Sequence, residues 1–334
     1  MIISRTPFRI SLFGGGSDYP TWYRENGGSV LGMAIDKYCR ISVRHLPPFF
    51  EHKHRIVYSR IELVNDIDKI EHPAVRAILR EMNIGKDGIE IHHDGDLPAR
   101  SGLGSSSSFT VGLLNALNAL KGRHVSRYEL AHEAIRIEQD VIRENVGSQD
   151  QIWASYGGFN RIDFARDGSF DVRPIIVPLQ RRIELQSSIM MFFTGLSRIA
   201  SEVAGAKIAN LEKKKRHVKT MTHMVDEALD ILNSPSRPLS EMGELLHEGW
   251  MLKRELTEKV STPVIDEIYE AGRAAGATGG KLLGAGGGGF MVFFVPADRR
   301  YAVREKLSKL IHVSFNIDTA GSRIMLYEPN GFAG

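Results

Sequence analysis

Hydrophobic positions along the chain follow two different spacings, and each spacing predicts one type of element. Apolar residues three or four positions apart, such as Phe109, Leu113 and Leu117, indicate helices with one buried face. The helices predicted in this way cover 73–82, 109–120, 126–144, 199–232, 239–257, 262–275 and 297–310. Alternating or short apolar runs between polar and glycine residues indicate strands. We predict strands at 10–13, 30–35, 39–45, 88–93, 159–164, 189–193, 290–295, 313–317 and 323–327.

Strands prevail in the first part of the chain and long helices in the second. A length of 334 residues is sufficient for two domains with substantial cores. We place the boundary where an apolar run follows Arg181 and Arg182. The predicted domains are therefore residues 1–182 and residues 183–334, and the second is expected to be a β-rich domain covered by helices.

Composition and charge exclude several classes of protein. Hydrophobic residues make up 42% of the chain and charged residues 25%, as in ordinary globular proteins. A net charge of +3 is too small for nucleic acid to be the main partner, and the basic run at 213–216 contains no aromatic residue. Cys39 is the only cysteine, which excludes an intramolecular disulfide and a cysteine-based zinc site. Because neither a signal-peptide core nor an apolar run of membrane-spanning length occurs, we expect a cytoplasmic protein without a membrane partner.

A segment rich in glycine and serine, residues 97–108, separates the predicted strand at 88–93 from the predicted helix at 109–120. Gly102 and Gly104 let the backbone approach a ligand, and the first helical turn supplies unpaired N–H groups at the positive end of the helix dipole. The serine hydroxyls can hold phosphate oxygens or a magnesium ion. The segment is therefore a candidate anion site. Its place between a strand and a helix argues against a flexible linker, and a plain helix N-terminus remains the alternative.

Two other kinds of phosphate-binding site can be excluded from the sequence. No Gly-Lys-Ser/Thr sequence occurs in the chain, which excludes a Walker A loop. Residues 14–18 form a second glycine turn, which ends in Asp18. Residues 281–289 contain glycines at the spacing of the dinucleotide-binding fingerprint, but that fingerprint requires a helix after the glycines. Because residues 290–295 are predicted to be a strand, we reject a dinucleotide site.

One carboxylate lies within the apolar stripe of a predicted helix. The helix at 126–144 begins with a capping box, Ser126 and Glu129. Glu138 lies three or four positions from the apolar residues of the stripe, which are Ala134, Ile135, Val141 and Ile142. A buried carboxylate requires a cation or hydrogen bonds. The alternative, a helix rotated so that Glu138 reaches solvent, stays open.

Three segments together resemble the motifs of one enzyme family. Residues 5–10 with 14–18 resemble the first motif of the GHMP small-molecule kinases, residues 98–108 their phosphate loop and residues 281–289 their third, glycine-rich motif. Because order and spacing agree over nearly the whole chain, the protein is identified as a member of this family. The resemblance implies the two-domain α+β GHMP kinase fold. An N-terminal mixed α/β domain and a C-terminal ferredoxin-like α+β domain are then expected to enclose the active site in the cleft between them.

The resemblance also implies a role for each motif, with ATP and Mg²⁺ as cofactors. Asp150 falls where the family has its catalytic aspartate, although the pattern alone would make it an Asx-turn residue at a helix end. Arg9 falls where a basic residue faces that aspartate, and Glu138 where magnesium is bound together with the hydroxyl of Ser106 or Ser105. The residues implied to bind ATP are Pro98, Ser101, Gly102, Leu103, Gly104, Ser105, Ser106 and Ser107. Those implied to bind the acceptor are Gly15, Gly16, Ser17, Asp18, Arg198, Gly286 and Gly287.

The residues of the first motif indicate a subgroup of the family. Residues 14–20 and 193–201 resemble the subgroup that contains heptose 7-phosphate kinases and the kinase half of fucose kinases, and the Glu-His pair of galactokinases is absent. The resemblance implies ATP-dependent phosphorylation of the anomeric hydroxyl of a heptose 7-phosphate, for nucleotide-heptose biosynthesis, by a monomer or homodimer. Arg198 is the predicted ligand of the 7-phosphate, with Lys37 or Arg161 as the other candidates. A fucokinase-like enzyme and a catalytically silent sensor of sugar and ATP remain alternatives.

Overall fold

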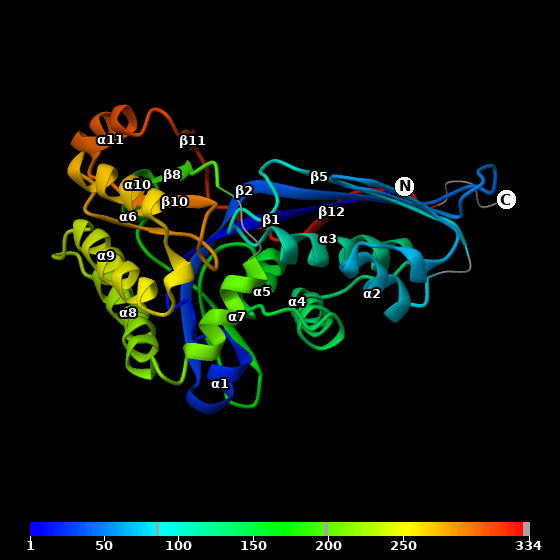
Figure 1. Ribbon diagram of the computed structural model, residues 1–334, viewed down its shortest axis with the longest axis horizontal. Helices are drawn as coiled ribbons and strands as arrows, with labels where there is room; N and C mark the ends of the chain where they lie inside the picture. The colour runs from blue at the N-terminus through cyan, green and yellow to red at the C-terminus, as the bar shows by residue number, and fades with distance from the viewer. Residues whose placement is uncertain (85–86, 197–199, 330–334) are drawn as a thin grey trace.

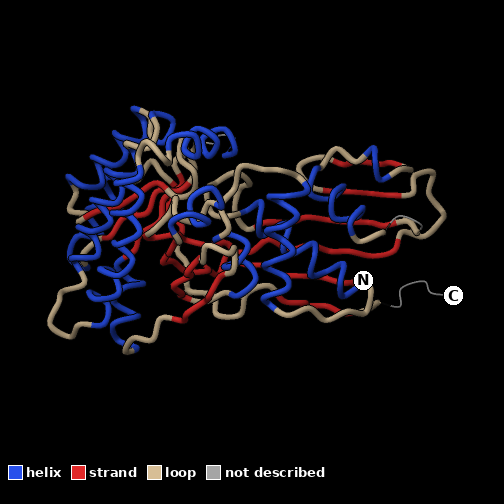
Figure 2. Tube along the Cα trace, turned by 90° about the horizontal axis from the view of Figure 1, so that it is seen from below, coloured by secondary structure: helices blue, strands red, loops and turns tan. Residues whose placement is uncertain are grey.

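The computed structural model describes residues 1–84, 87–196 and 200–329. It consists of an extended sheet with helices on one face and a second, smaller sheet with its own helices (Figure 1). In a view turned by 90°, the strands of the extended sheet run side by side towards the end where the N-terminus lies (Figure 2). The predicted α+β class is confirmed, and both sheets contribute to the region between them where the candidate site lies.

The first sheet is built on two long strands. Strand β1 (Ile2–Phe13) pairs antiparallel with β2 (Gly28–His45) over nearly its whole length. We predicted two strands here, at 30–35 and 39–45, which are separated by residues such as Asp36 and Lys37. In the structure the chain stays extended, since the pairing with β1 absorbs these two residues as an irregularity in register.

The remaining strands of this sheet come from distant parts of the chain. The sheet order is β12-β1-β2-β5-β3-β4, and β6 and β7 extend from the first half of β2. The bounds are β3 His54–Val57, β4 Ile61–Val64, β5 Ile89–Gly95, β6 Phe159–Phe164, β7 Phe170–Pro174 and β12 Arg323–Tyr327. The last strand, β12, pairs antiparallel with β1. The predicted C-terminal domain, residues 183–334, thus includes a strand that belongs to the first sheet.

The helices of the first part lie on one face of this sheet (Figure 1). They are α1 Pro20–Asn26, α2 Pro73–Glu81, α3 Ser105–Leu120, α4 Arg127–Arg136 and α5 Gln149–Tyr156. Helix α3 packs against β1 and β2 and is buried along most of its length, which confirms the predicted helix after the glycine and serine segment. Its N-terminus is therefore held at the centre of the molecule.

The second sheet has the topology expected for a ferredoxin-like domain. Its strands are β8 Ile189–Phe193, β9 Gly279–Leu282, β10 Phe290–Phe294 and β11 Ile311–Val313. All pairs are antiparallel, and the order β11-β8-β10-β9 places the last strand beside the first and the third beside the second. The predicted ferredoxin-like arrangement is confirmed.

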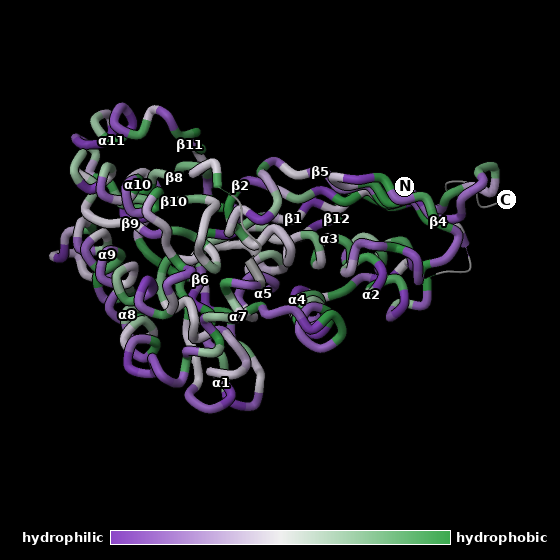
Figure 3. Tube along the Cα trace, in the orientation of Figure 1, coloured by the Kyte–Doolittle hydropathy of each residue, from purple (hydrophilic) through white to green (hydrophobic). Residues whose placement is uncertain are grey.

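The described residues from 179 onwards form further helices. They are α6 Leu179–Ser188, α7 Ala200–Asn210, α8 Lys215–Asn233, α9 Ser240–Arg254, α10 Pro263–Ala274 and α11 Arg300–Lys306. The predicted helix at 199–232 is divided into α7 and α8, because α8 packs on α9 and on β1 and β2 whereas α7 lies beside residues 258–260. Figure 3 shows hydrophilic and hydrophobic residues alternating along α8, as expected for a helix with one buried face. None of the described helices has the length and apolar character needed to span a membrane.

Candidate active site

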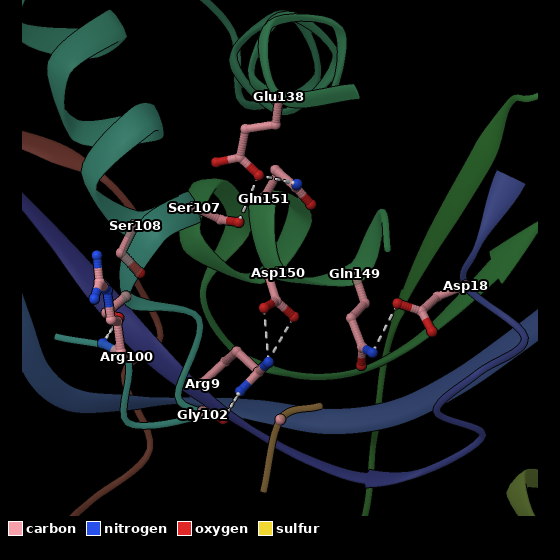
Figure 4. Close-up of polar contacts among 12 residues, drawn as sticks. Arg9, Asp18, Arg100, Gly102, Ser107, Ser108, Glu138, Gln149, Asp150 and Gln151 are labelled. Atoms are coloured by element: carbon pink, nitrogen blue, oxygen red, sulfur yellow. Dashed lines mark hydrogen bonds and ion pairs between the residues drawn. The ribbon is translucent and has the colours of Figure 1, made fainter. Parts of the chain in front are cut away.

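A cavity lies where the two parts of the protein meet. Its walls are formed by β1, the turn at 14–18, the phosphate loop and the start of α5, together with α7, α8, α9 and the third glycine-rich segment. Three segments that are far apart in the sequence are thus brought to one place. Figure 4 shows the polar contacts at its centre.

Arg9 and Asp150 form the central pair. Nε and Nη2 of Arg9 each donate a hydrogen bond of 2.7 Å to one carboxylate oxygen of Asp150 (Figure 4). The third guanidinium nitrogen, Nη1, donates to the carbonyl oxygen of Gly102 at 2.6 Å. Among the described residues the Asp150 carboxylate bonds only to Arg9 and to no neighbouring amide, so the Asx-turn interpretation is wrong. The structure thus shows Arg9 facing Asp150, as predicted.

The phosphate loop requires its glycines. Gly102 and Gly104 have φ angles of 80° and 74°, which favour glycine, and Gly104 caps α3. A Cβ atom at Gly104 would lie 3.3 Å from Oδ2 of Asp150, so glycine also makes room for the carboxylate. The residues of the loop that line the cavity are Gly102, Gly104, Ser105, Ser106 and Ser107, with Arg100 beside them.

Three residues predicted to bind ATP do not line the cavity. Leu103 is buried in the core, and its carbonyl oxygen accepts a hydrogen bond from the backbone of Arg9 at 3.0 Å. Ser101 is also buried, and Pro98 is exposed outside the cavity. These residues shape the loop, because consecutive residues of a tight turn cannot all face the same side.

Glu138 is buried, so the alternative of a solvent-facing side chain is wrong. The helix that we predicted at 126–144 ends in a π-turn, Ile137–Val141, in which the amide of Ile142 donates to the carbonyl of Ile137. Oε2 of Glu138 accepts hydrogen bonds from Ser107 at 2.8 Å and from the side chain of Gln151 (Figure 4). Burial raises the pKa of Glu138 to about 7.

The surroundings of Glu138 fit a magnesium ion. Its second oxygen, Oε1, is buried and has no hydrogen-bond partner within the described structure. The hydroxyl that bonds to the carboxylate is that of Ser107, and the predicted metal ligands Ser106 and Ser105 also line the cavity. Magnesium keeps several waters and needs few protein oxygens.

Asp18 closes the opposite end of the cavity. Its Oδ1 accepts from the amide of Gly16 at 2.9 Å, and its Oδ2 accepts from the side chain of Gln149 at 2.8 Å. Burial raises the pKa of Asp18. Gly15 and Gly16 line the cavity as predicted for the acceptor site. Ser17 does not, because its hydroxyl bonds to the backbone of the turn and of the next strand, at Gly14 and Ser29.

The third glycine-rich segment contacts the phosphate loop and also forms part of the cavity wall. Gly286 and Gly287, predicted to bind the acceptor, do not line the cavity, and the amide of Gly287 donates to the carbonyl of Val260. The amide of Phe290 donates to the carbonyl of Ser101 at 3.1 Å. Gly286 and Gly287 thus lie outside the cavity wall, to which the same segment contributes Lys281, Gly284 and Ala285. Arg198 lies outside the described residues.

Three buried lysines line the cavity, and the sequence analysis missed them. Lys207, Lys253 and Lys281 are each less than 10% exposed. The amine of Lys253 donates to two carbonyl oxygens at 2.7 Å, and that of Lys281 donates to the carbonyl of Leu12 at 2.7 Å. Burial lowers the pKa of Lys281 to about 7. A signal was present for two of them, because Lys207 and Lys253 lie within the apolar stripes of their helices, as Glu138 does.

Two family models match the chain in the expected order. The model of the GHMP kinases N terminal domain matches residues 68–158, and that of the GHMP kinases C terminal matches residues 228–312. Together they cover more than half of the chain. The phosphate loop and Asp150 lie within the first match, and the third glycine-rich segment lies within the second.

Individual relatives extend the similarity to nearly the whole chain. The D-glycero-alpha-D-manno-heptose 7-phosphate kinase of Campylobacter jejuni is 27% identical over 317 residues, which is 92% of this chain and 93% of that relative. The bifunctional fucokinase/GDP-fucose pyrophosphorylase of Arabidopsis thaliana is 26% identical over 93% of this chain, which corresponds to 31% of that longer protein.

Solved structures agree in fold. A D-glycero-D-manno-heptose 1-phosphate kinase from Bacteroides thetaiotaomicron superimposes with a TM-score of 0.78 at 23% identity, covering 98% of this chain and 99% of the other. The galactokinase of Lactococcus lactis in complex with galactose gives a TM-score of 0.72 at 21% identity, covering 96% and 94%. The order of the motifs, the two-sheet architecture and the family models lead to one conclusion: the chain belongs to the GHMP kinase family.

Proposed function

We propose that this kinase transfers the γ-phosphoryl group of ATP to the anomeric hydroxyl of D-glycero-D-manno-heptose 7-phosphate. The product is the 1,7-bisphosphate, a precursor of nucleotide-activated heptose. The observation that carries the proposal is the Arg9–Asp150 pair, which lies between the phosphate loop and the Asp18 turn in a single cavity. The choice of sugar rests on the 27% identity with a heptose 7-phosphate kinase over almost the whole chain.

Asp150 is the proposed general base. As the sugar oxygen attacks the γ-phosphorus, its proton passes to the Asp150 carboxylate and the bond to the bridging oxygen of ADP breaks. An anomeric hydroxyl is more acidic than an ordinary alcohol, so a carboxylate is a sufficient base. Arg9 fixes both oxygens of the carboxylate and links them to the phosphate loop through Gly102.

The phosphate loop is the proposed site of the ATP phosphates. The N-terminus of α3 directs its unpaired amides and the positive end of its dipole at the cavity, and the serine side chains add hydroxyl donors. Glu138 and Ser107 would hold Mg²⁺, which neutralises charge on the phosphates during transfer when it is bound.

A second candidate is a fucokinase-like activity on an unphosphorylated sugar. The 26% identity with the fucokinase part of a bifunctional enzyme supports it. The two candidates differ in one chemical respect, since a heptose 7-phosphate carries a second anionic group that fucose lacks.

An ADP-release assay over a small panel of acceptors tests the proposal. The panel contains the heptose 7-phosphate, the same heptose without phosphate, L-fucose and D-galactose, each with ATP and Mg²⁺. We expect the highest kcat/KM for the heptose 7-phosphate, with the new phosphate on C1 by phosphorus NMR. A preference for L-fucose would favour the second candidate, and the absence of turnover with all sugars would favour a catalytically silent protein.

A further inference from the structure

We propose that Lys207 binds the phosphate group that the sugar substrate already carries. The proposal deepens the proposed function and rests on it. It assigns a second anion site within the cavity, separate from the phosphate loop and beside Asp18.

Lys207 occupies an unusual place for an amine. It projects from α7, is only 4% exposed and lines the cavity, with its amine 5.5 Å from the centre of the Tyr19 ring. Within the described residues this amine makes neither a hydrogen bond nor an ion pair to a protein group. The charges of Asp18 and Asp150 favour the ammonium form, but neither carboxylate bonds to it among the described residues, and burial, the larger effect, lowers the pKa of Lys207. A buried ammonium without hydrogen bonds is costly. A group held in this way has all three donors available for a ligand.

The other cationic residues that line the cavity already have partners or a different position. Arg9 is bonded to Asp150 and Gly102, and the amines of Lys253 and Lys281 are bonded to backbone carbonyls. Arg100 belongs to the phosphate loop itself. Among the residues that the structure describes, Lys207 is therefore the cavity cation without a hydrogen-bonded partner at the acceptor end.

The charge of the cavity also favours an anionic acceptor. Within the described residues its walls carry five basic side chains, Arg9, Arg100, Lys207, Lys253 and Lys281, and two carboxylates, Asp18 and Asp150. The excess of positive charge attracts anions. A neutral sugar hydroxyl cannot compensate a buried ammonium, whereas a phosphate accepts charge-assisted hydrogen bonds from it.

Arg198, the residue that we predicted for this role, lies outside the described residues, and the two other candidates have different positions. Lys37 is paired with Asp36, and Arg161 with Asp163 and Asp226. Neither residue lines the cavity.

The test compares Lys207→Met with wild type on two acceptors, the heptose 7-phosphate and the same heptose without phosphate. Methionine retains the length and packing of the side chain but removes its charge. We expect the ratio of kcat/KM for the phosphorylated over the unphosphorylated acceptor to fall by about 10- to 100-fold, as for a lost hydrogen bond to a charged group. The KM for ATP should change by less than about twofold, because the phosphate loop is untouched. Lys207→Arg should restore part of the ratio.

Lys215→Met provides the control, since Lys215 lies on the neighbouring helix α8 and pairs at the surface with Glu212. It should leave the ratio unchanged. An equal loss of activity on both acceptors in Lys207→Met would mean that Lys207 acts on the sugar or on Asp18. If Lys207→Met and wild type have equal kcat/KM on both acceptors, Lys207 does not bind the phosphate. Either result overturns the proposal.

A binding measurement separates failure of this proposal from failure of the proposed function. Wild type and Lys207→Met are heated with ADP and Mg²⁺, with and without inorganic phosphate. We expect phosphate to raise the melting temperature of wild type more than that of the variant, whichever sugar is the substrate. If no heptose is turned over but this difference is present, the proposed acceptor is wrong and the anion site stands. Equal stabilisation of the two proteins contradicts the anion site.

Discussion

Arg9 and Asp150 are joined by two parallel hydrogen bonds of 2.7 Å, and the same guanidinium reaches the Gly102 carbonyl at 2.6 Å. One side chain of β1 thus couples the carboxylate at the start of α5 to the loop before α3. Such a forked arrangement is specific to arginine, because its planar group donates in several fixed directions at once. The position of the proposed base and that of the phosphate loop are therefore not independent.

Asp150→Asn should lower kcat by about 100-fold or more, because the amide is nearly isosteric but cannot accept the proton. The KM for the sugar should change much less. Steady-state kinetics checks both constants, with Asp298→Asn at an exposed surface position as the control. Near-normal kcat in Asp150→Asn would show that the residue is structural and that transfer depends on positioning alone.

Arg9→Lys should lower kcat by about 10- to 100-fold although the positive charge is kept, since an ammonium cannot make both bonds to Asp150 and the bond to Gly102. The matched control is Arg173→Lys, at an exposed pair with Asp171. Activity equal to wild type in Arg9→Lys would mean that charge alone is required at this position.

The raised pKa of Glu138 predicts that the stability of the protein depends on pH. Its pKa is about 7 in the folded protein, against an ordinary value of 4.5, because burial disfavours the charged form. Between these values the folded state binds more protons than the unfolded state, so the free energy of unfolding falls as the pH rises from about 4.5 to about 7. Glu138→Gln should remove this contribution, which amounts to about 3 kcal/mol.

Urea unfolding in the absence of magnesium, from pH 5 to pH 7.5, measures this effect. The variant should gain stability relative to wild type as the pH rises. Glu212→Gln, at an exposed position, should show no such trend. Parallel curves for wild type and Glu138→Gln would contradict the assigned pKa.

Turnover should require Mg²⁺. Excess EDTA should reduce the rate by at least about 100-fold, because the charge of the triphosphate is then not neutralised, and added Mg²⁺ should restore it. Glu138→Ala should need a higher Mg²⁺ concentration for half-maximal rate or lose turnover, while its circular dichroism spectrum stays that of wild type. Full activity in EDTA would rule out the metal role of Glu138.

Gly104→Ala and Gly122→Ala form a matched pair. Both residues have positive φ angles, 74° and 70°, so each alanine should cost about 1–2 kcal/mol of stability. A Cβ at position 122 meets nothing within 4 Å, whereas one at position 104 crowds Arg9 and Asp150. Only Gly104→Ala should therefore lose activity, by about 10-fold or more. Equal kcat in the two variants would show that the space beside Asp150 is not needed.

Local patterns in the sequence were sufficient for much of the architecture. The apolar spacing after residue 108 predicted α3, and the strand after the third glycine-rich segment excluded a dinucleotide site, which the structure confirms with β10. Gly102 and Gly104 could be recognised from the sequence because a backbone conformation that favours glycine is a local property of the residue. The resemblance to the GHMP kinases, carried by the order of three such segments, led to the ferredoxin-like second domain.

Which side chains share the cavity depends on contacts between elements far apart in the chain. Ser107 rather than Ser106 meets Glu138 because the π-turn and α3 pack together, and the amide of Phe290 bonds to Ser101 because the end of the third glycine-rich segment lies against the phosphate loop. In the same way β12 completes the first sheet although it follows the second. Periodicity shows that a residue such as Lys207 lies on the buried side of its helix, but what it faces there is set by the packing of α7 against the Tyr19 region. That packing involves residues almost two hundred positions apart, and no local pattern records it.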